Sequence, residues 1–255
     1  MKNKPKALLF DMDGTITDPR QHITEEVVEA LRSLPNGIKL HLVTGSDMSK
    51  IEEQIPVPLL LDLFDRVYAC NGTSVYNCSL DMDDEANPIE PELIHRVTLL
   101  DHYSEADINH IVTVLLRKAA NTHTKIKTGT FVEWRGSQIS FSVIGRNCTR
   151  DQRLDYVLWD KKSREREKIV KFLRDEFQGW GLSFRLGGQI SIDITREGWD
   201  KSYAFENMPQ APEQCIFFGD KICKDGNDLD IAMKCSKYHN IDSPADLLLQ
   251  LQEYK

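Results

Sequence analysis

Short apolar runs alternate with helical patterns over the first seventy residues of the chain. Strands are predicted at KALLF (6–10), IKLHLV (38–43) and DRVYAC (65–70), because short apolar runs bounded by polar residues are typical of buried strands. Between them, residues 24–34 place apolar side chains at helical spacing, and residues 47–55 predict a second helix. This alternation favours a parallel sheet covered by helices.

The last sixty residues resume the same pattern. An apolar strand at QCIFFGD (214–220) ends in a carboxylate, a helix begins near residues 227–234, and an amphipathic helix closes the chain at 243–252. Because both ends carry the same alternation, we expect them to form one sheet.

The middle of the chain differs from both ends. Its predicted elements are a long helix at 104–120, strands at 129–135 and 137–146, and a charged helix at 161–177. A turn at Gly136 and Ser137 favours antiparallel pairing of the two strands. We therefore predict an α/β fold: a Rossmann-like parallel-sheet core domain over 1–83 and 189–255, with an inserted α+β cap domain over 84–188 that contains an antiparallel sheet.

Composition narrows the class of protein. The 255 residues are 40% hydrophobic, which suffices for a core, and the formal charge of −8 argues against binding to nucleic acid or an anionic membrane. Six cysteines without C-x-x-C pairs indicate reduced thiols, and no apolar run approaches the ~20 residues of a membrane helix. The N-terminal apolar run is too short for a secretory signal, so we expect a cytoplasmic protein.

Polar residues follow three of the predicted strands. They are Asp11 and Asp13 after the first, Thr44 and Ser46 after the second, and Asp220 after the later one, with Asn227 and Asp228 opening the next helix. The carboxyl ends of parallel strands form the ligand-binding edge of an open sheet. Hard oxygen ligands of this kind suit magnesium, which a substrate phosphate can complete.

The first acidic pair, Asp11 and Asp13, also fits two simpler interpretations. A calcium loop would place glycine and glutamate where this chain has Ile16 and His22. A plain acidic turn remains an alternative for Asp11 and Asp13 alone, but the recurrence of FFGD and GND after another strand disfavours it.

Four motifs carry a family resemblance. FDMDGT, VTGSD, the lysine of GWDK and FFGDKICKDGND resemble, in order, the motifs of the haloacid dehalogenase superfamily of phosphotransferases. The resemblance implies that Asp11 is the nucleophile, forming an aspartyl phosphate, and that Asp13 is the general acid/base.

The same resemblance implies roles for the remaining motif residues. Thr44, with Ser46 as the competing choice, and Lys201 would hold the transferring phosphate. Magnesium would bind Asp11, the main-chain carbonyl of Asp13, and Asp220. Asp228, with Asn227 beside it, would position Lys201 or a metal-bound water.

The middle segment adds a candidate anion site. Arg135 and Arg146 end the two predicted strands, Arg153 follows near a helix start, and guanidinium groups match phosphate geometry. Alternation of Gln189, Ser191 and Asp193 points polar side chains along one strand face. Considered singly, each arginine is more typical of a solvated surface charge. The strand that carries Gln189, Ser191 and Asp193 is, by itself, typical of a half-exposed strand.

These segments are similar to the eukaryotic-type phosphomannomutases, with a C2-type cap, as are PRQ (19–21) and GGQIS. The similarity implies that Arg135, Arg146, Arg153 and Ser191 hold the distal phosphate and that Arg20 and Asp193 contact the hexose phosphate substrate. It further implies interconversion of mannose 6-phosphate and mannose 1-phosphate, a hexose 1,6-bisphosphate activator, and a homodimer through the cap.

Several residues depart from the mutase pattern. Thr44 is the residue that phosphatases prefer, Cys70 replaces an expected glutamate, Thr128 replaces an expected arginine, and the loop at 232–240 lacks an acidic residue for a second cation. The alternative is therefore a magnesium-dependent sugar-phosphate phosphatase. A sugar-phosphate-binding protein without activity is a third hypothesis.

Overall fold

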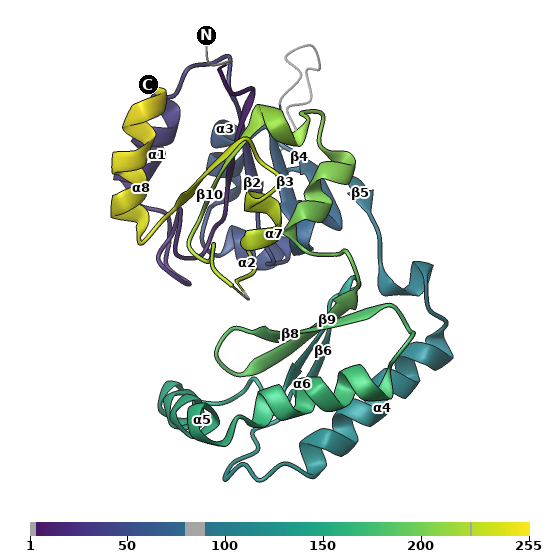
Figure 1. Cartoon of the computed structure of the whole chain (residues 1–255). Coiled ribbons are helices and arrows are strands. Elements are labelled where there is room, and N and C mark those ends of the chain that lie inside the picture. The colour runs from purple at the N-terminus through teal and green to yellow at the C-terminus, as the bar shows by residue number, and fades with distance from the viewer. Residues whose placement is uncertain (1–3, 80–89, 225) are drawn as a thin grey trace. The chain divides into compact units, whose positions relative to one another are not determined.

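The computed structural model of the chain describes residues 4–79, 90–224 and 226–255. Two compact units are present, one formed by Met1–Arg96 with Trp199–Lys255 and the other by Val97–Gly198. We call them the first and the second unit (Figure 1). The boundary expected after residue 83 falls outside the described residues, and the first unit extends to Arg96 because β5 (Glu92–Arg96) pairs within its sheet. The later boundary lies after Gly198 and not after 188, because residues 191–196 pair with the sheet of the second unit.

The first unit contains a seven-stranded sheet in the order β11-β10-β1-β2-β3-β4-β5. The parallel strands are β1 (Ala7–Phe10), β2 (Lys39–Val43), β3 (Arg66–Ala69), β10 (Cys215–Gly219) and β11 (Lys237–Asn240). The antiparallel edge consists of β4 (Ser74–Asn77) and β5 (Glu92–Arg96). Strand β1 pairs with β10 on one side and β2 on the other, which confirms that both ends of the chain share one sheet.

Apolar side chains of β1 are buried on both faces of this sheet. Leu8 and Phe10 join one core with residues of α1 (Glu25–Arg32), α2 (Met48–Glu52), α3 (Val57–Leu63) and α8 (Pro244–Gln250). Ala7 and Leu9 join a second core with α7 (Leu229–Ala232) and the 3₁₀ helix η3 (Lys201–Asn207). Burial on both faces explains the continuous apolar run, which is typical of a parallel sheet.

The second unit contains a four-stranded antiparallel sheet in the order β6-β7-β9-β8. Its strands are β6 (Val132–Trp134), β7 (Gln138–Ser142), β8 (Leu182–Gly187) and β9 (Ser191–Arg196). Helix α4 (Glu105–Ala120) contacts β6, and α6 (Glu165–Glu176) contacts β8 and β9; α5 (Arg150–Ser163) lies between them in sequence. The α/β fold class with a separate antiparallel sheet is confirmed.

One face of this second sheet is polar. Strand register aligns Glu133 with Ser140, Ser140 with Asp193, and Asp193 with Arg185. Because side chains alternate along a strand, the intervening residues Ile139, Phe141, Ile192 and Ile194 point to the opposite face, where they are fully buried. We call the side that carries Glu133, Ser140, Asp193 and Arg185 the polar face.

The charged helix predicted at 161–177 is two helices. Helix α5 ends at Ser163, Arg164 adopts a left-handed conformation (φ 52°), and α6 begins at Glu165. The backbone N–H of Arg166 donates to Asp160 Oδ1 (3.0 Å), and its guanidinium donates to Asp160 Oδ2 (2.7 Å) and to the carbonyl of Gly188 (3.1 Å). These tertiary contacts fix the break, which local periodicity could not indicate.

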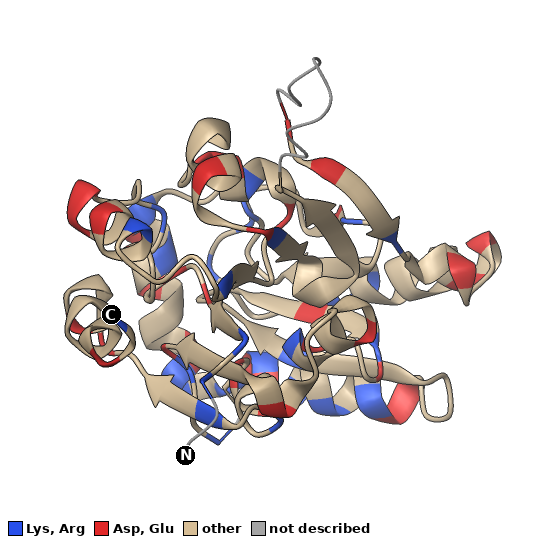
Figure 2. Ribbon diagram, turned by 90° about the horizontal axis from the view of Figure 1, so that it is seen from above, with Lys and Arg blue, Asp and Glu red and all other residues tan. Residues whose placement is uncertain are grey.

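Two smaller differences concern the strands, and several elements were not expected. Gln189 lies in the turn between β8 and β9, and β7 ends at Ser142, four residues before Arg146. The pattern also predicted neither α3 nor the antiparallel edge strands. No described helix is long and apolar enough to cross a membrane. Basic and acidic segments are interspersed along the ribbon (Figure 2).

Burial of His41 predicts a pH-dependent stability. This residue of β2 is 2% exposed, and its Nε2 lies 3.0 Å from Oε1 of Gln210. Burial lowers the pKa of His41 to about 4, against the hydrogen bond to Gln210. The His41 imidazole therefore becomes protonated at higher pH in the unfolded chain than in the folded protein. The folded protein keeps its full stability above about pH 6.5 and loses part of it as the pH falls toward 4.

We expect the titration of His41 to lower the free energy of unfolding by about 3 kcal/mol as the pH falls from 7 to 4. Urea denaturation at a series of pH values measures the effect. The His41→Leu variant should show a smaller decrease than the unsubstituted protein over the same range, and parallel curves would contradict the prediction.

Candidate active site

Asp11 lies at the carboxyl end of β1, between β2 and β10. Its backbone N–H donates to the carbonyl of Phe218 (2.9 Å), which continues the β1–β10 ladder by one residue. The side chain is buried, with 4% of the residue exposed. A carboxylate so placed needs a positive partner, because burying an uncompensated charge is costly.

Lys201 supplies that partner. It is 1% exposed at the start of η3, and its Nζ donates to Asp11 Oδ1 and to Asp228 Oδ1. The other oxygen of Asp228 accepts the backbone N–H of Lys221 (3.0 Å). Three segments far apart in sequence therefore meet in one buried charge cluster.

The charges in this cluster oppose one another. Burial and, to a smaller extent, Asp228 raise the pKa of Asp11 to about 7 against the opposing effect of Lys201. Burial disfavours the charge on Lys201, but Asp11 and Asp228 outweigh it and raise its pKa. A further positive charge beside Asp11 would favour its ionised form.

Asp220 provides an oxygen suited to a cation. Its Oδ2 accepts a hydrogen bond from Lys221 Nζ (2.6 Å), whereas its buried Oδ1 has no hydrogen-bond partner among the described residues. Gly14 (φ 89°) packs against this carboxylate, and a Cβ there would lie 2.7 Å from Asp220 Oδ2.

One oxygen each from Asp11, Asp220 and Asp228 lies within 4.8 Å of the others, so the group is compatible with a divalent metal ion. Because both oxygens of Asp228 already accept N–H groups, Asp228 fits the positioning of Lys201 better than direct coordination. Asn227 lies exposed in the turn just before it.

Asp13 lies in a loop that folds back on itself. Its Oδ1 accepts the backbone N–H of Arg20 (3.3 Å), and Arg20 has a left-handed backbone (φ 64°). The hydroxyl of Thr17, buried in this loop, donates to Gln54 Oε1 (2.8 Å). These contacts hold Asp13 and Arg20 together in the first unit.

Thr44 and Ser46 form the loop after β2. Thr44 is buried, and its Oγ1 accepts the backbone N–H of Ser46 (3.2 Å). The backbone N–H of Asn71 donates to the Thr44 carbonyl (2.8 Å), and a Cβ on Gly45 would lie 3.2 Å from Asn71 Oδ1. Asn71 was missed by the sequence analysis as a loop partner; its position before Gly72 at the end of β3 was the available signal.

The polar face of the second unit brings two predicted arginines together on Glu133. Glu133 Oε2 accepts from Arg135 Nε (3.0 Å) and Nη2 (2.5 Å) and forms an ion pair with Arg146 Nε (3.2 Å). Arg146 Nη1 also donates to the hydroxyls of Ser140 (3.1 Å) and Ser191 (3.3 Å). Glu133 was not predicted, although its i, i+2 spacing to Arg135 on a strand places both on one face.

Asp193 extends the same cluster. Its Oδ1 accepts from Ser140 Oγ (3.0 Å), and a Cβ on Gly187 would lie 2.2 Å from its Oδ2. Burial raises the pKa of Asp193 against the pull of Arg135 and Ser140. Arg153 lies in the first turn of α5, on a different element from the hairpin segments that carry Arg135 and Arg146.

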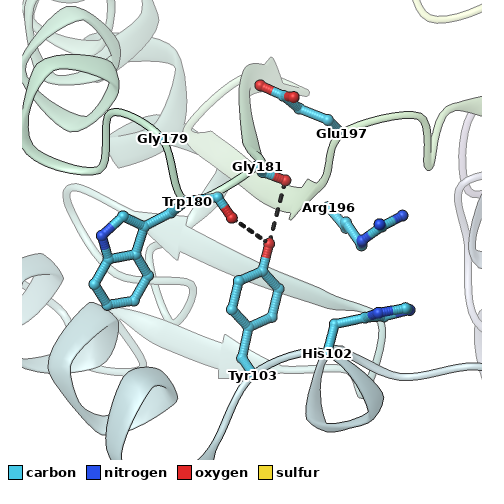
Figure 3. A pocket seen from close by; sticks show the side chains of 7 residues that line it. All are labelled: His102, Tyr103, Gly179, Trp180, Gly181, Arg196 and Glu197. Atoms are coloured by element: carbon cyan, nitrogen blue, oxygen red, sulfur yellow. Dashed lines mark hydrogen bonds between the residues drawn. The ribbon is translucent and has the colours of Figure 1, made fainter.

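A separate cavity of about 470 Å³ lies in the second unit, away from these residues. It is lined by His102, Tyr103, Gly179, Trp180, Gly181, Arg196 and Glu197. Figure 3 shows the Tyr103 hydroxyl, which donates to the carbonyls of Trp180 (2.9 Å) and Gly181 (3.2 Å). No predicted site residue lines it.

The fold resembles that of solved structures whose sequences are only distantly similar. A haloacid dehalogenase-like hydrolase from Bacteroides thetaiotaomicron superposes with a TM-score of 0.60 at 13% identity, covering 98% of this chain and 99% of that one. An IMP-nucleotidase from Plasmodium falciparum gives a TM-score of 0.62 at 14% identity, covering 99% and 68%. The chain thus has the haloacid dehalogenase-like fold, as the motifs indicated.

Comparison of sequences identifies the family more narrowly than comparison of folds does. Residues 27–254 match the family model described as eukaryotic phosphomannomutase. Phosphomannomutase 2 of Dictyostelium discoideum is 35% identical over 256 residues, covering 99% of this chain and 98% of that protein. Phosphomannomutase 1 of Homo sapiens is 36% identical over 256 residues, covering 99% and 93%. The chain belongs to the eukaryotic phosphomannomutase family, which confirms the resemblance drawn from its motifs.

The buried charge cluster predicts a large effect of Lys201 on stability. Lys201→Met leaves Asp11 and Asp228 close together without their counter-charge, and breaking such a buried pair costs about 3 kcal/mol or more. We expect this loss in the free energy of unfolding, measured by urea denaturation in the presence of a chelator.

The double variant Lys201→Met/Asp228→Asn is the matched control. Since it removes one of the two repelling carboxylates, it should recover part of the lost stability. A single variant as stable as the unsubstituted protein would contradict the assigned charge pairing.

Proposed function

We propose that this protein is a phosphomannomutase that interconverts mannose 6-phosphate and mannose 1-phosphate. The family match over residues 27–254 carries the proposal, and the buried Asp11–Lys201–Asp228 cluster supports a phosphotransferase site at the sheet edge. A sugar phosphate is the substrate class that the family implies.

Asp11 is proposed to attack phosphorus and form an aspartyl phosphate. In this step the Asp11 oxygen forms the new P–O bond, the bond to the sugar oxygen breaks, and Asp13 gives that oxygen a proton. The second half-reaction reverses the roles: a sugar hydroxyl attacks the aspartyl phosphate and Asp13 takes its proton. Thr44, Ser46 and Lys201 hold the phosphoryl oxygens while charge develops on them.

Magnesium is the proposed metal, held by Asp11, the Asp13 carbonyl and Asp220. When bound, it would offset the negative charge of the carboxylates and of the phosphoryl group. The buried Oδ1 of Asp220, which has no hydrogen-bond partner in the part of the chain that the structure describes, supports this assignment. Asp228 keeps Lys201 in place beside the nucleophile.

The second unit is proposed to act as a cap that selects the substrate. Arg135, Arg146 and Ser191 would bind the distal phosphate, with Arg153 nearby, and Arg20 and Asp193 would contact the sugar. The polar face supports this, since Arg146 already reaches both Ser140 and Ser191. Guanidinium groups with fixed orientation suit a phosphate dianion.

A hexose 1,6-bisphosphate is the proposed activator, because it can phosphorylate Asp11 and leave a hexose monophosphate. Homodimerisation through the second unit is proposed from the resemblance, and a cytoplasmic location from the short N-terminal apolar run. Size-exclusion chromatography with light scattering tests the dimer, and cell fractionation tests the location.

The mutase reaction is tested by incubation with mannose 1-phosphate, magnesium and a hexose bisphosphate. We expect mannose 6-phosphate to form faster than free phosphate, because transfer to a sugar hydroxyl must outpace hydrolysis of the aspartyl phosphate. ³¹P NMR follows both products in one sample. The phosphatase alternative predicts instead that phosphate release dominates.

The Asp11→Asn variant is the control for the mechanism. It should lose sugar-phosphate turnover and retain no covalent phosphate after acid quenching, because the amide is a poor nucleophile. Full activity of this variant would exclude the aspartyl-phosphate mechanism.

Metal dependence gives an independent prediction. EDTA should abolish turnover and magnesium should restore it, since the carboxylate cluster requires a counter-charge near the phosphate. Asp220→Asn should raise the magnesium concentration for half-maximal activity several-fold, measured by titration after chelator treatment. The Lys237→Met variant should leave this concentration unchanged, because Lys237 lies at the start of β11, beside Ile216 and at the opposite end of the strands from Asp220, and pairs with Glu253. Full activity in excess chelator would contradict the proposed site.

A further inference from the structure

The Glu133 carboxylate lies between two arginine side chains of the polar face. A single oxygen, Oε2, accepts two N–H groups of Arg135 and lies 3.2 Å from Arg146 Nε. The three side chains are only 11% (Arg135), 22% (Arg146) and 32% (Glu133) exposed. Their interaction is therefore less screened by water than an ordinary surface ion pair.

The backbone positions Glu133, Arg135 and Arg146 beside one another through separate local features. Glu133 and Arg135 are two residues apart at the end of β6, and the N–H of Arg135 donates to the carbonyl of Gln138 (2.9 Å) across the hairpin. Arg146 arrives through a tight turn at Gly145 (φ 86°). A Cβ on Gly145 would lie 2.1 Å from the carbonyl oxygen of Gly129, so only glycine permits this approach.

The two guanidinium groups would repel one another without a shared anion. Arg146 is held from two sides, with Nε toward Glu133 and Nη1 toward the hydroxyls of Ser140 and Ser191. Glu133 contacts both arginines directly, through the hydrogen bonds of Arg135 and the ion pair with Arg146. Fixing flexible side chains before a ligand arrives lowers the entropy lost on binding.

We propose that Glu133 is a positioning residue that orients Arg135 and Arg146 to receive the distal phosphate of the sugar phosphate. This rests on the proposed function of the second unit. Glu133 acts through the arginines and does not touch the phosphate, whose negative charge it would repel.

Glu133→Ala tests the proposal. The loss of one charge-assisted contact should raise the KM for mannose 1-phosphate about tenfold. The kcat should stay within about twofold, because the distal phosphate is bound equally in the ground state and the transition state. Isothermal titration calorimetry with mannose 6-phosphate should show the same weakening. Glu133→Gln, which keeps an acceptor oxygen at the same reach, should recover part of the affinity.

Two controls separate positioning from a general structural role. Glu176→Ala, at an exposed glutamate that ends α6, should leave KM unchanged. In the Arg135→Ala background, Glu133→Ala should raise KM much less than in the unsubstituted protein, because one of the groups it orients is gone. Thermal unfolding of each variant shows whether folding is retained.

Three outcomes would overturn the proposal: an unchanged KM, tighter binding in Glu133→Ala, or additive effects with Arg135→Ala. Tighter binding would mean that Glu133 competes with the phosphate for the arginines. The failure of the proposed function is distinct, since it would appear as absent isomerisation in the unsubstituted protein. Calorimetry would still report the role of Glu133 in binding in that case.

Discussion

A lysine buried between two carboxylates is the interaction on which the acidic edge of the first unit depends. Asp11 follows β1, Asp228 precedes α7, and Lys201 opens η3, so three distant segments meet through one ammonium group. Neither carboxylate could be buried as an anion without it. The parallel strands place the two carboxylates at one edge of the sheet, and the ammonium group of Lys201 offsets their repulsion and the cost of burying them.

The second unit contains the same arrangement of three charges, but with positive and negative groups exchanged. There Glu133 lies between Arg135 and Arg146, where Lys201 lies between Asp11 and Asp228 in the first unit. In each case two like charges are brought close by backbone geometry and held by one opposite charge. Such a cluster is suited to a ligand of that opposite sign: a cation beside the carboxylates and a phosphate beside the arginines.

Local sequence signals predicted the parts that depend on near neighbours along the chain. Strands β1, β2 and β10 and helices α1, α4 and α8 carry clear apolar patterns, and the residues that follow each strand identified the acidic edge. The break at Arg164 was not predictable, because contacts of Arg166 with Asp160 and Gly188 fix it. The shared contact of Glu133 also depends on how the Gly145 turn returns Arg146 to the sheet.

Thr128, which stands where an arginine is expected, has a structural task in this chain. Its backbone N–H and its hydroxyl both donate to the carbonyl of Ile144 (2.9 and 3.0 Å), next to the turn that carries Arg146. Thr128 therefore supplies no positive charge of its own, but it helps to fix the turn that carries the positively charged Arg146. In the proposed phosphate site, the guanidinium groups of Arg135 and Arg146 face two carboxylates, those of Glu133 and Asp193. Affinity must come from their fixed orientation and not from an excess of charge, which is why the turn and the shared carboxylate matter more here than the count of arginines.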